Sequence, residues 1–167
     1  MRAKANLEAL SRVCAFDDVR VWSNTPEHAK SFAREHNAVA MDAESAVRGA
    51  DVIVTATNAR EPILKGAWLK RGAHVNAVGS PRPTWRELDD AAMASVLIVD
   101  SREAVLKESG DVILSDATIH AEAGEIFAGT RSVPSDGATV FKSVGIAIED
   151  LAAAQLVYQA SLARAQT

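Results

Sequence analysis

The sequence predicts an α/β fold with a doubly wound parallel sheet, on two observations. Short β-rich segments alternate along the chain with helical patterns, which is the order expected of βαβ crossovers. The last three of the four β-rich segments are apolar at consecutive positions, as expected for strands covered on both faces. A length of 167 residues without internal repeats fits one domain.

Helix signals are clear near the start of the chain. Leu7, Leu10 and Cys14 share one stripe of a helical pattern. Further along, Thr25 is a favourable N-cap, and Pro26 takes the first helical position behind it. Two amphipathic or capped helices are therefore expected before residue 40.

Glycines mark the ends of two later helices. Gly49 follows the pattern of residues 43–48, and Gly129 follows that of residues 117–127. The C-terminal pattern, from 145 to 163, is a long alanine-rich helix. In order, the chain predicts helices over 3–15, 26–36, 43–48, 85–93, 101–109, 117–127 and 145–163, strands over 19–22, 52–57, 74–79 and 96–100, and a loop over 133–138.

The composition is that of a soluble globular protein, with 48% hydrophobic and 24% charged residues. A net charge of −4 without a run of Lys or Arg excludes nucleic acid and anionic membranes as electrostatic partners, so a small molecule is expected. No segment has the apolar length of a membrane span or the apolar core of a signal peptide. The single cysteine, Cys14, permits no disulfide or cysteine metal cluster and is expected to be buried. These features predict a cytoplasmic protein without a metal site.

Small polar residues follow each predicted strand. In an open parallel sheet, ligands bind beyond the carboxyl ends of the strands. These residue types are also common in ordinary turns, but their recurrence at four strand ends favours one shared ligand crevice. The four groups are Ser23-Asn24-Thr25, Thr57-Asn58, Gly79-Ser80 and Asp100-Ser101.

The first strand end indicates a dinucleotide coenzyme. An acidic residue at this place accepts the ribose hydroxyls of NAD, whereas a neutral donor favours the 2′-phosphate of NADP. The chain has Ser23 there and no acid, and Thr25 opens a helix whose N–H groups favour an anion. NADP is therefore preferred, and NAD stays open because Asn24 stands where a strong phosphate site has a cation.

The glycine-rich phosphate loop of such a domain is missing from the sequence. It is expected about 20 residues before the ribose-reading position, and that count back from Ser23 reaches Met1. None of the nine glycines forms a Gly-x-Gly pair. The chain is therefore expected to begin inside the first helix, truncated before its first strand. Without that central strand, two strands would lack a hydrogen-bonding neighbour.

Five runs of residues are distinctive as a set: VRVWSNT over 19–25, GAHVNAVG over 72–79, WRELD over 85–89, KESGD over 107–111 and VFKSVG over 140–145. Together they resemble the ornithine cyclodeaminase/mu-crystallin family, and within it the ketimine reductase branch, from about Lys4 to Ala163. The resemblance implies a Rossmann-type domain that holds NAD(P)H to reduce the C=N bond of a cyclic ketimine carboxylate.

The resemblance also implies features outside this chain. Members of the family have a separate substrate domain, toward which the C-terminal helix from about residue 145 would pack, and they form homodimers, a state not assumed here. Relatives also bind thyroid hormone, so a binding protein without turnover is one alternative, and an impaired truncated product is another. Ornithine cyclodeamination is disfavoured by Pro81, where that branch has a catalytic Asp.

The matched runs imply a set of site residues, none of them assigned as catalytic. Arg82, between two prolines that preset its backbone, would bind the substrate carboxylate, with a solvated loop arginine as the alternative. Lys142 is expected to be a strand-edge lysine with its head in solvent, in preference to a functional cation. The implied coenzyme residues are Ser23, Asn24 and Thr25 beside the 2′-phosphate, Thr57, Ala77, Val78, Gly79 and Asp100 along the cleft, and Ser143, Val144 and Gly145 near the nicotinamide.

Overall fold

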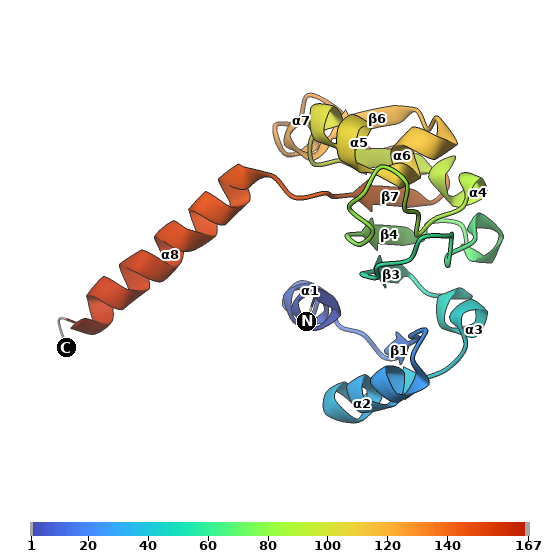
Figure 1. The fold of residues 1–167 in the computed structure, drawn as a ribbon, viewed down its shortest axis with the longest axis horizontal. Helices are drawn as coiled ribbons and strands as arrows, with labels where there is room; N and C mark the ends of the chain where they lie inside the picture. The colour runs from blue at the N-terminus through green and yellow to red at the C-terminus, as the bar shows by residue number, and fades with distance from the viewer. Residues whose placement is uncertain (1, 166–167) are drawn as a thin grey trace.

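The computed structural model describes residues 2–165 and has an α/β fold in which every strand pairing is parallel (Figure 1). Within these residues, β3 to β7 form a five-stranded sheet in the order β3-β4-β7-β5-β6, and β1 pairs with β2 in a separate sheet. The strands are β1 (Arg20–Val21), β2 (Val39–Ala40), β3 (Val52–Thr55), β4 (His74–Ala77), β5 (Val96–Val99), β6 (Ile119–Glu122) and β7 (Thr139–Lys142).

The helices lie between the strands, as the predicted alternation requires. They are α1 (Arg2–Leu10), α2 (Pro26–His36), α3 (Ala43–Val47), α4 (Asp90–Met93), α5 (Arg102–Glu108), α6 (Gly110–Ser115), α7 (Ala123–Phe127) and α8 (Ala147–Ala165), with a 3₁₀ turn at Gly66–Trp68. The doubly wound parallel architecture predicted from the sequence is therefore confirmed.

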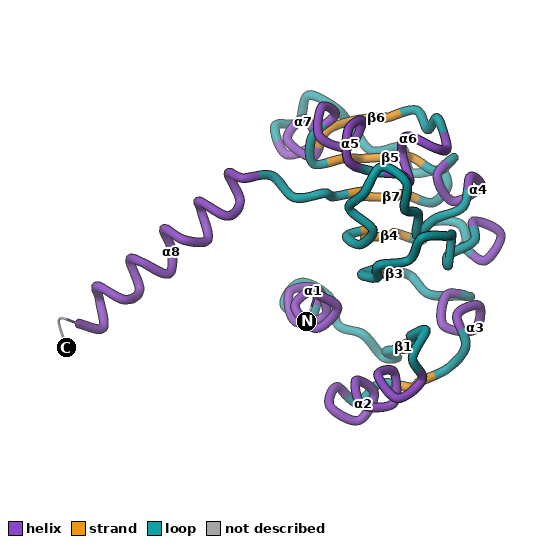
Figure 2. The backbone as a smooth tube through the Cα atoms, in the orientation of Figure 1, coloured by secondary structure: helices purple, strands orange, loops and turns teal. Residues whose placement is uncertain are grey.

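The two sheets have four edge strands within the described residues: β1 and β2 in the small sheet, and β3 and β6 in the large one. β1 pairs only with β2, and β3 pairs only with β4, within the described part of the chain. Figure 2 shows β1 well apart from β3, with α1 beside them, and α1 contacts β3. Two strands were predicted to lack a hydrogen-bonding neighbour, and the free edges of β1 and β3 fit that prediction.

The core lies on the face of the five-stranded sheet that is covered by the segments after β4 and β5. Val75, Val140 and Leu97 form one row across three neighbouring strands, and all three are fully buried. Leu88 and Met93 from the covering segments complete this core. Burying side chains of this size contributes about 1.5–3 kcal/mol each, so this face stabilises the position of the strand ends.

Two predicted helices are wrong in part. Residues 117–127 were expected to form one helix, but β6 occupies the first half because it pairs with β5 at the edge of the sheet, and only α7 is helical. Residues 85–93 are helical only in α4, where the Asp89 side chain accepts the N–H groups of Ala92 and Gly66 at 2.8 Å. In both cases tertiary pairing overrides helix propensity.

The C-terminal helix α8 stands apart from the sheets, as Figure 1 shows in red. It starts two residues later than predicted, and three of its large side chains, Leu151, Leu156 and Tyr158, are more than half exposed. Cys14, expected to be buried, is exposed because the turn after α1 faces away from the sheet core. Among the described residues, no helix has the length and apolarity needed to cross a membrane.

Lowering the pH is expected to remove stability that Glu125 contributes. Its Oε2 accepts the Glu122 N–H at 2.7 Å and Arg102 Nη2 at 3.0 Å, and these bonds lower the pKa of the carboxyl group. Because the folded-state pKa lies below the unfolded one, this stabilisation is complete above the ordinary glutamate range and is lost as the pH falls through the lowered value. The melting temperature of the wild type should exceed that of Glu125→Gln at neutral pH, and the difference should shrink on acidification.

A matched control for this pH series is Glu61→Gln. Glu61 is exposed in the loop after β3, and no hydrogen bond or ion pair is recorded for it among residues 2–165. Circular dichroism melts of all three proteins from about pH 7 to about pH 3 separate the local effect from general acid unfolding. A Glu125→Gln deficit that stays constant over this range contradicts the prediction.

Candidate functional site at the carboxyl edge of the sheet

Asp100 joins the carboxyl ends of β5 and β7. Its Oδ2 accepts Ser143 Oγ at 2.9 Å and the N–H groups of Val144 and Gly145 at 2.8 Å, and its Oδ1 accepts the Ser101 N–H at 2.8 Å. The structure therefore brings four of the predicted site residues together, and the carboxylate fixes the turn that follows β7. Bonds from backbone N–H groups to a carboxylate are charge-assisted and hold such a turn firmly.

Glu87 joins the ends of β3 and β4 in the same way. Its Oε1 accepts the Thr57 N–H at 2.6 Å and Thr57 Oγ1 at 2.7 Å. Its Oε2 accepts Thr55 Oγ1 at 2.8 Å and the Gly79 N–H at 3.0 Å. Glu87 is fully buried, and these four bonds satisfy its carboxylate. Two predicted site residues, Thr57 and Gly79, thus share one buried anchor.

The turn after β4 connects the two anchored groups. The Ala77 carbonyl accepts the Ser143 N–H at 3.1 Å, which places the β7 turn beside the end of β4. The next residues are Val78, Gly79 and the fully buried Ser80, whose φ of 45° is left-handed. That backbone region is unfavourable for a residue with a side chain, and such strain is often stored at functional sites.

A cavity of about 270 Å³ lies at this edge, between α1 and the ends of β4 and β7. Arg2 Nη1 donates to the Val78 carbonyl at 3.0 Å across one side of it. Gly145, at φ 84°, has open space where a side chain would project, so no atoms of the chain fill that part of the cavity. The lining residues are Arg2, Ala5, Asn6, Val78, Ser143, Val144 and Gly145.

The remaining predicted coenzyme residues lie at the end of β1, in the other sheet. The Thr25 N–H donates to Ser23 Oγ at 3.2 Å, and Thr25 is the N-cap of α2. Arg20 donates to the Arg48 carbonyl at 2.8 Å and forms an ion pair with Asp18. Its guanidinium is therefore bonded to the segment that ends α3 and to the loop before β1. No recorded hydrogen bond or ion pair within residues 2–165 links Ser23, Asn24 or Thr25 to the groups around Asp100 and Glu87.

Lys142 corrects a prediction. It was expected to place its head in solvent, but it is fully buried, because it shares the covered face of the sheet with Val140. Its Nζ lies 2.9 Å from Asp111 Oδ2 and donates to the Gly79 carbonyl at 2.7 Å. Asp111, also fully buried, accepts the N–H groups of Glu87 and Leu88 through Oδ1.

Arg82 lies on the exposed loop after β4. Its guanidinium carbon sits 5.3 Å from the ring centroid of Trp85, and that of Arg60 sits 5.4 Å from the same ring. No acidic partner is recorded for either arginine in the described part of the chain. Stacking on an aromatic ring restrains a guanidinium without neutralising it, so both charges stay available to an anion.

Sequence reasoning missed the buried charges and the α1 residues of this site. Glu87, Asp111 and Lys142 come from three separate segments, and nothing in their local patterns shows that they meet. The one usable signal is that Lys142 lies two residues after Val140, and so on the same face of a strand as this apolar residue. Arg2 and Asn6 were not among the predicted site residues, although the predicted helix over 3–15 includes Asn6.

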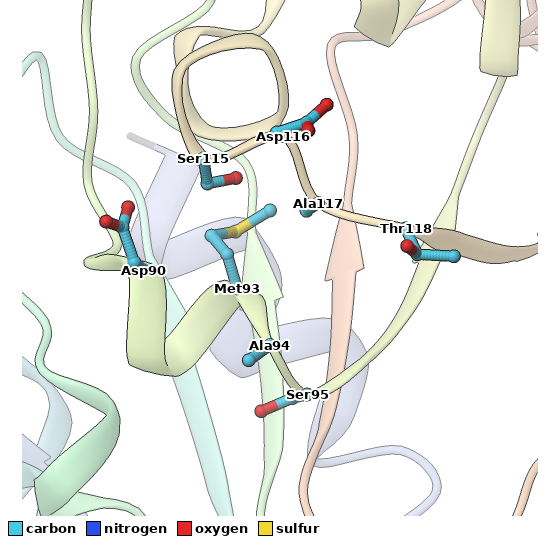
Figure 3. A pocket seen from close by; sticks show the side chains of 8 residues that line it. All are labelled: Asp90, Met93, Ala94, Ser95, Ser115, Asp116, Ala117 and Thr118. Carbon is cyan, nitrogen blue, oxygen red and sulfur yellow. The ribbon is translucent and has the colours of Figure 1, made fainter.

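A second cavity, of about 320 Å³, lies at the opposite edge of the sheet, before β5 and β6 (Figure 3). Its carboxylates belong to Asp90, which pairs with Arg86, and to Asp116. Ligands of open parallel sheets bind at the carboxyl edge, so this cavity is not the coenzyme candidate. The lining residues are Asp90, Met93, Ala94, Ser95, Ser115, Asp116, Ala117 and Thr118.

Comparison with protein families gives a match over residues 1–165 to the model described as the ornithine cyclodeaminase/mu-crystallin family. The chain is 52% identical over 162 residues to ketimine reductase mu-crystallin of Mus musculus, an alignment that covers 95% of this chain and 52% of that protein. The chain thus spans about half the length of the curated relatives it matches.

Solved structures give the same likeness. Delta(1)-pyrroline-2-carboxylate reductase of Thermococcus litoralis, in complex with NADH and L-proline, matches with a TM-score of 0.90 and 36% identity, over 98% of this chain and 56% of that one. An archaeal alanine dehydrogenase dimer with bound NAD matches with a TM-score of 0.87 and 31% identity, over 97% of this chain and 55% of that one.

Proposed function

This chain belongs to the ornithine cyclodeaminase/mu-crystallin family, and from that premise we propose that its carboxyl edge holds NAD(P)H for the reduction of the C=N bond of a cyclic ketimine carboxylate. The observation that carries the proposal is the cavity at the ends of β4 and β7, lined by Val78 and by the turn that Asp100 fixes. It lies where ligands of doubly wound sheets bind. The relatives' names add the reaction class, because they describe reductases of cyclic imines.

The residues present fit one end of a dinucleotide. On the side of β4 and β7 the cavity wall consists of small side chains and backbone, and the open space at Gly145 admits a flat ring close to the turn. When bound, the coenzyme supplies the hydride that the imine carbon receives. Val78, Ser143, Val144 and Gly145 would line its nicotinamide end, and Thr57, Ala77 and Gly79 would shape the cleft beside it.

The residues that line the cavity would position the coenzyme and the substrate, and they would not exchange protons with them. Arg2 is the one ionisable side chain among the residues that line this cavity, and an arginine keeps its proton. The proton that the imine nitrogen gains on reduction therefore comes from water or from the substrate domain. Arg82 would bind the substrate carboxylate, since its exposed guanidinium is restrained on Trp85 and has no recorded acidic partner within residues 2–165.

The apolar face of α8 supports the proposed domain arrangement. Ile148, Leu151, Tyr158 and Leu162 recur at helical spacing on one stripe and are exposed. We propose that this stripe packs against the substrate domain that relatives carry, and that the enzyme works in the cytoplasm. A polypeptide limited to these residues would be impaired, because the substrate side of the site lies outside it.

Coenzyme binding tests the proposed function. Titration of the purified chain with NADPH and with NADH, followed by the change in nicotinamide fluorescence, should give saturable binding that competes with NADP⁺. Absence of binding to either coenzyme contradicts the proposal. If labelled thyroid hormone instead binds saturably in equilibrium dialysis, while neither coenzyme does, a hormone-binding protein without turnover replaces the reductase.

The NADP preference has its own test at Asn24, which follows β1 and is exposed. Asn24→Arg should raise the affinity for NADPH over NADH by about tenfold or more, because a guanidinium makes charge-assisted bonds to a 2′-phosphate worth about 1.5–3 kcal/mol. Asn58→Arg, which adds the same charge at the end of β3, is the matched control and should leave the ratio of the two dissociation constants unchanged. Equal shifts in both variants would show a general charge effect instead of a 2′-phosphate site at β1.

A further inference from the structure

A closed circuit of buried hydrogen bonds and one ion pair holds both the N–H and the carbonyl of Gly79. The Gly79 N–H donates to Glu87 Oε2 at 3.0 Å, and the Gly79 carbonyl accepts Lys142 Nζ at 2.7 Å. Lys142 pairs with Asp111 at 2.9 Å, and Asp111 accepts the Glu87 N–H at 2.8 Å. The circuit therefore closes from Gly79 through Lys142, Asp111 and Glu87 back to Gly79. All three charged side chains are fully buried.

Stability alone does not account for this arrangement. Two buried charges lose their hydration, and replacing a buried ion pair by neutral groups of similar size is often neutral or stabilising. An apolar lysine substitute would fill the same volume beside Val140, but it would leave the Gly79 carbonyl without its donor. What Lys142 specifically provides is therefore the bond to that carbonyl.

The circuit holds the Val78–Ser80 turn, which contains a backbone conformation that is unfavourable for a residue with a side chain. Gly79 lies between Val78, whose carbonyl accepts Arg2 at the cavity wall, and Ser80, whose φ of 45° is left-handed. Ser80 is further held by its N–H bond to the Thr57 carbonyl at 2.8 Å and by its Oγ bond to the Ala59 carbonyl at 2.6 Å. A strained backbone keeps such a shape only when several surrounding groups determine it.

We propose that Lys142 is a positioning residue: with Asp111 and Glu87, it clamps the Gly79 peptide and so fixes the Val78–Ser80 turn that forms one wall of the cavity. The part of this inference that concerns the coenzyme rests on the proposed function. The part that concerns the turn is independent of it, because every bond of the circuit joins two groups of this chain. Lys142 is fully buried and does not line the cavity.

The test replaces the ion pair and the Lys142–Gly79 bond, and it keeps the bonds that Asp111 accepts from the backbone. Lys142→Met/Asp111→Asn removes both charges of the ion pair together, and the Asn side-chain oxygen still accepts the N–H groups of Glu87 and Leu88. Val140→Ala is the matched control, because it weakens the same face of β7 without touching the turn. Amide hydrogen exchange is measured by NMR for Gly79 and Ser80 and is expressed relative to Val75, which reports opening of the core sheet.

The double variant should fold and melt cooperatively, while the Gly79 and Ser80 amides exchange at least about tenfold faster relative to Val75. Val140→Ala should leave this ratio unchanged although it melts earlier. An unchanged ratio in the double variant overturns the inference and makes the ion pair merely structural. If the double variant does not fold, Glu87→Gln is measured instead, because it places a neutral amide group where the carboxylate accepts the Gly79 N–H. Faster exchange of Gly79 and Ser80 relative to Val75 supports the inference, and an unchanged ratio overturns it.

Coenzyme affinity separates this inference from the proposed function. If the wild type binds NADPH, the double variant should bind it at least about tenfold more weakly, and Val140→Ala should bind it as the wild type does. A double variant with loosened turn amides but wild-type affinity overturns the link between the clamp and the cavity. If the wild type binds no coenzyme, the proposed function fails, and the exchange ratio alone decides whether the clamp exists.

Discussion

A polypeptide of these 167 residues alone is expected to reduce a cyclic ketimine carboxylate with NADPH at less than about 1% of the rate of full-length mouse mu-crystallin. Reduction requires the donor and acceptor carbons to be held in contact, and that positioning can contribute about 7–11 kcal/mol. Under the proposed function the chain supplies only one wall of the site, and space is open at Gly145.

The rate is measured as loss of NADPH absorbance under identical substrate concentrations for both proteins. Addition of a separately purified N-terminal half of mu-crystallin should raise the rate, since it would bring a substrate domain to the exposed stripe on α8. A rate for the polypeptide alone that is comparable to that of the full-length relative contradicts the expectation and means that residues 1–167 suffice for catalysis.

The second large effect is expected from Gly79→Ala. An added Cβ would lie closer than 3.0 Å to Glu87 Oε1 and to the backbone N and O of Thr57. Neither backbone atom can move away cheaply, and Glu87 is itself held by four bonds, so the clash must open the turn. We expect a loss of about 3 kcal/mol in the free energy of unfolding, the upper range for overpacking, together with weaker coenzyme binding.

Urea unfolding measures this loss, and Gly124→Ala is the control. A Cβ at Gly124 meets nothing within 4 Å, and the residue lies in α7, so alanine there should be neutral or should stabilise by up to about 1 kcal/mol. Wild-type stability for Gly79→Ala would mean that the turn relaxes freely, and it would weigh against the clamp described above.

The sequence predicted best where local pattern and tertiary structure agree. Segments 52–55, 74–77 and 96–99 are strands, as predicted. β5 is an apolar run that is almost wholly buried, whereas β3 and β4 alternate buried and half-buried positions, so one of their faces is better covered than the other. β6 has Ile, His, Ala and Glu in sequence, which suits a helix equally well, and only pairing with β5 makes it a strand. The strand β7 was not assigned, because it ends in a charged residue whose partner, Asp111, lies in another segment.

The candidate site was predictable in outline only. The rule that ligands meet the carboxyl ends of strands placed Thr57, Gly79 and Asp100 on one edge, and the family resemblance added Ser143. Hydrogen bonds connect these residues in two groups, one around Glu87 and one around Asp100. The identity of the anchors was not predictable, since each binds backbone groups far away in the sequence. Whether Ser23 and Asn24 share a ligand with that edge stays a prediction, because they follow a strand of the other sheet.

The closed circuit around Gly79 also limits how this edge can change over time or be transplanted. Each of the four residues is bonded to two others, so a single substitution breaks two bonds. Substitutions at these positions during evolution therefore have to occur together. An engineer who grafts the edge onto another scaffold would therefore need to carry Gly79, Glu87, Asp111 and Lys142 together as one inseparable block.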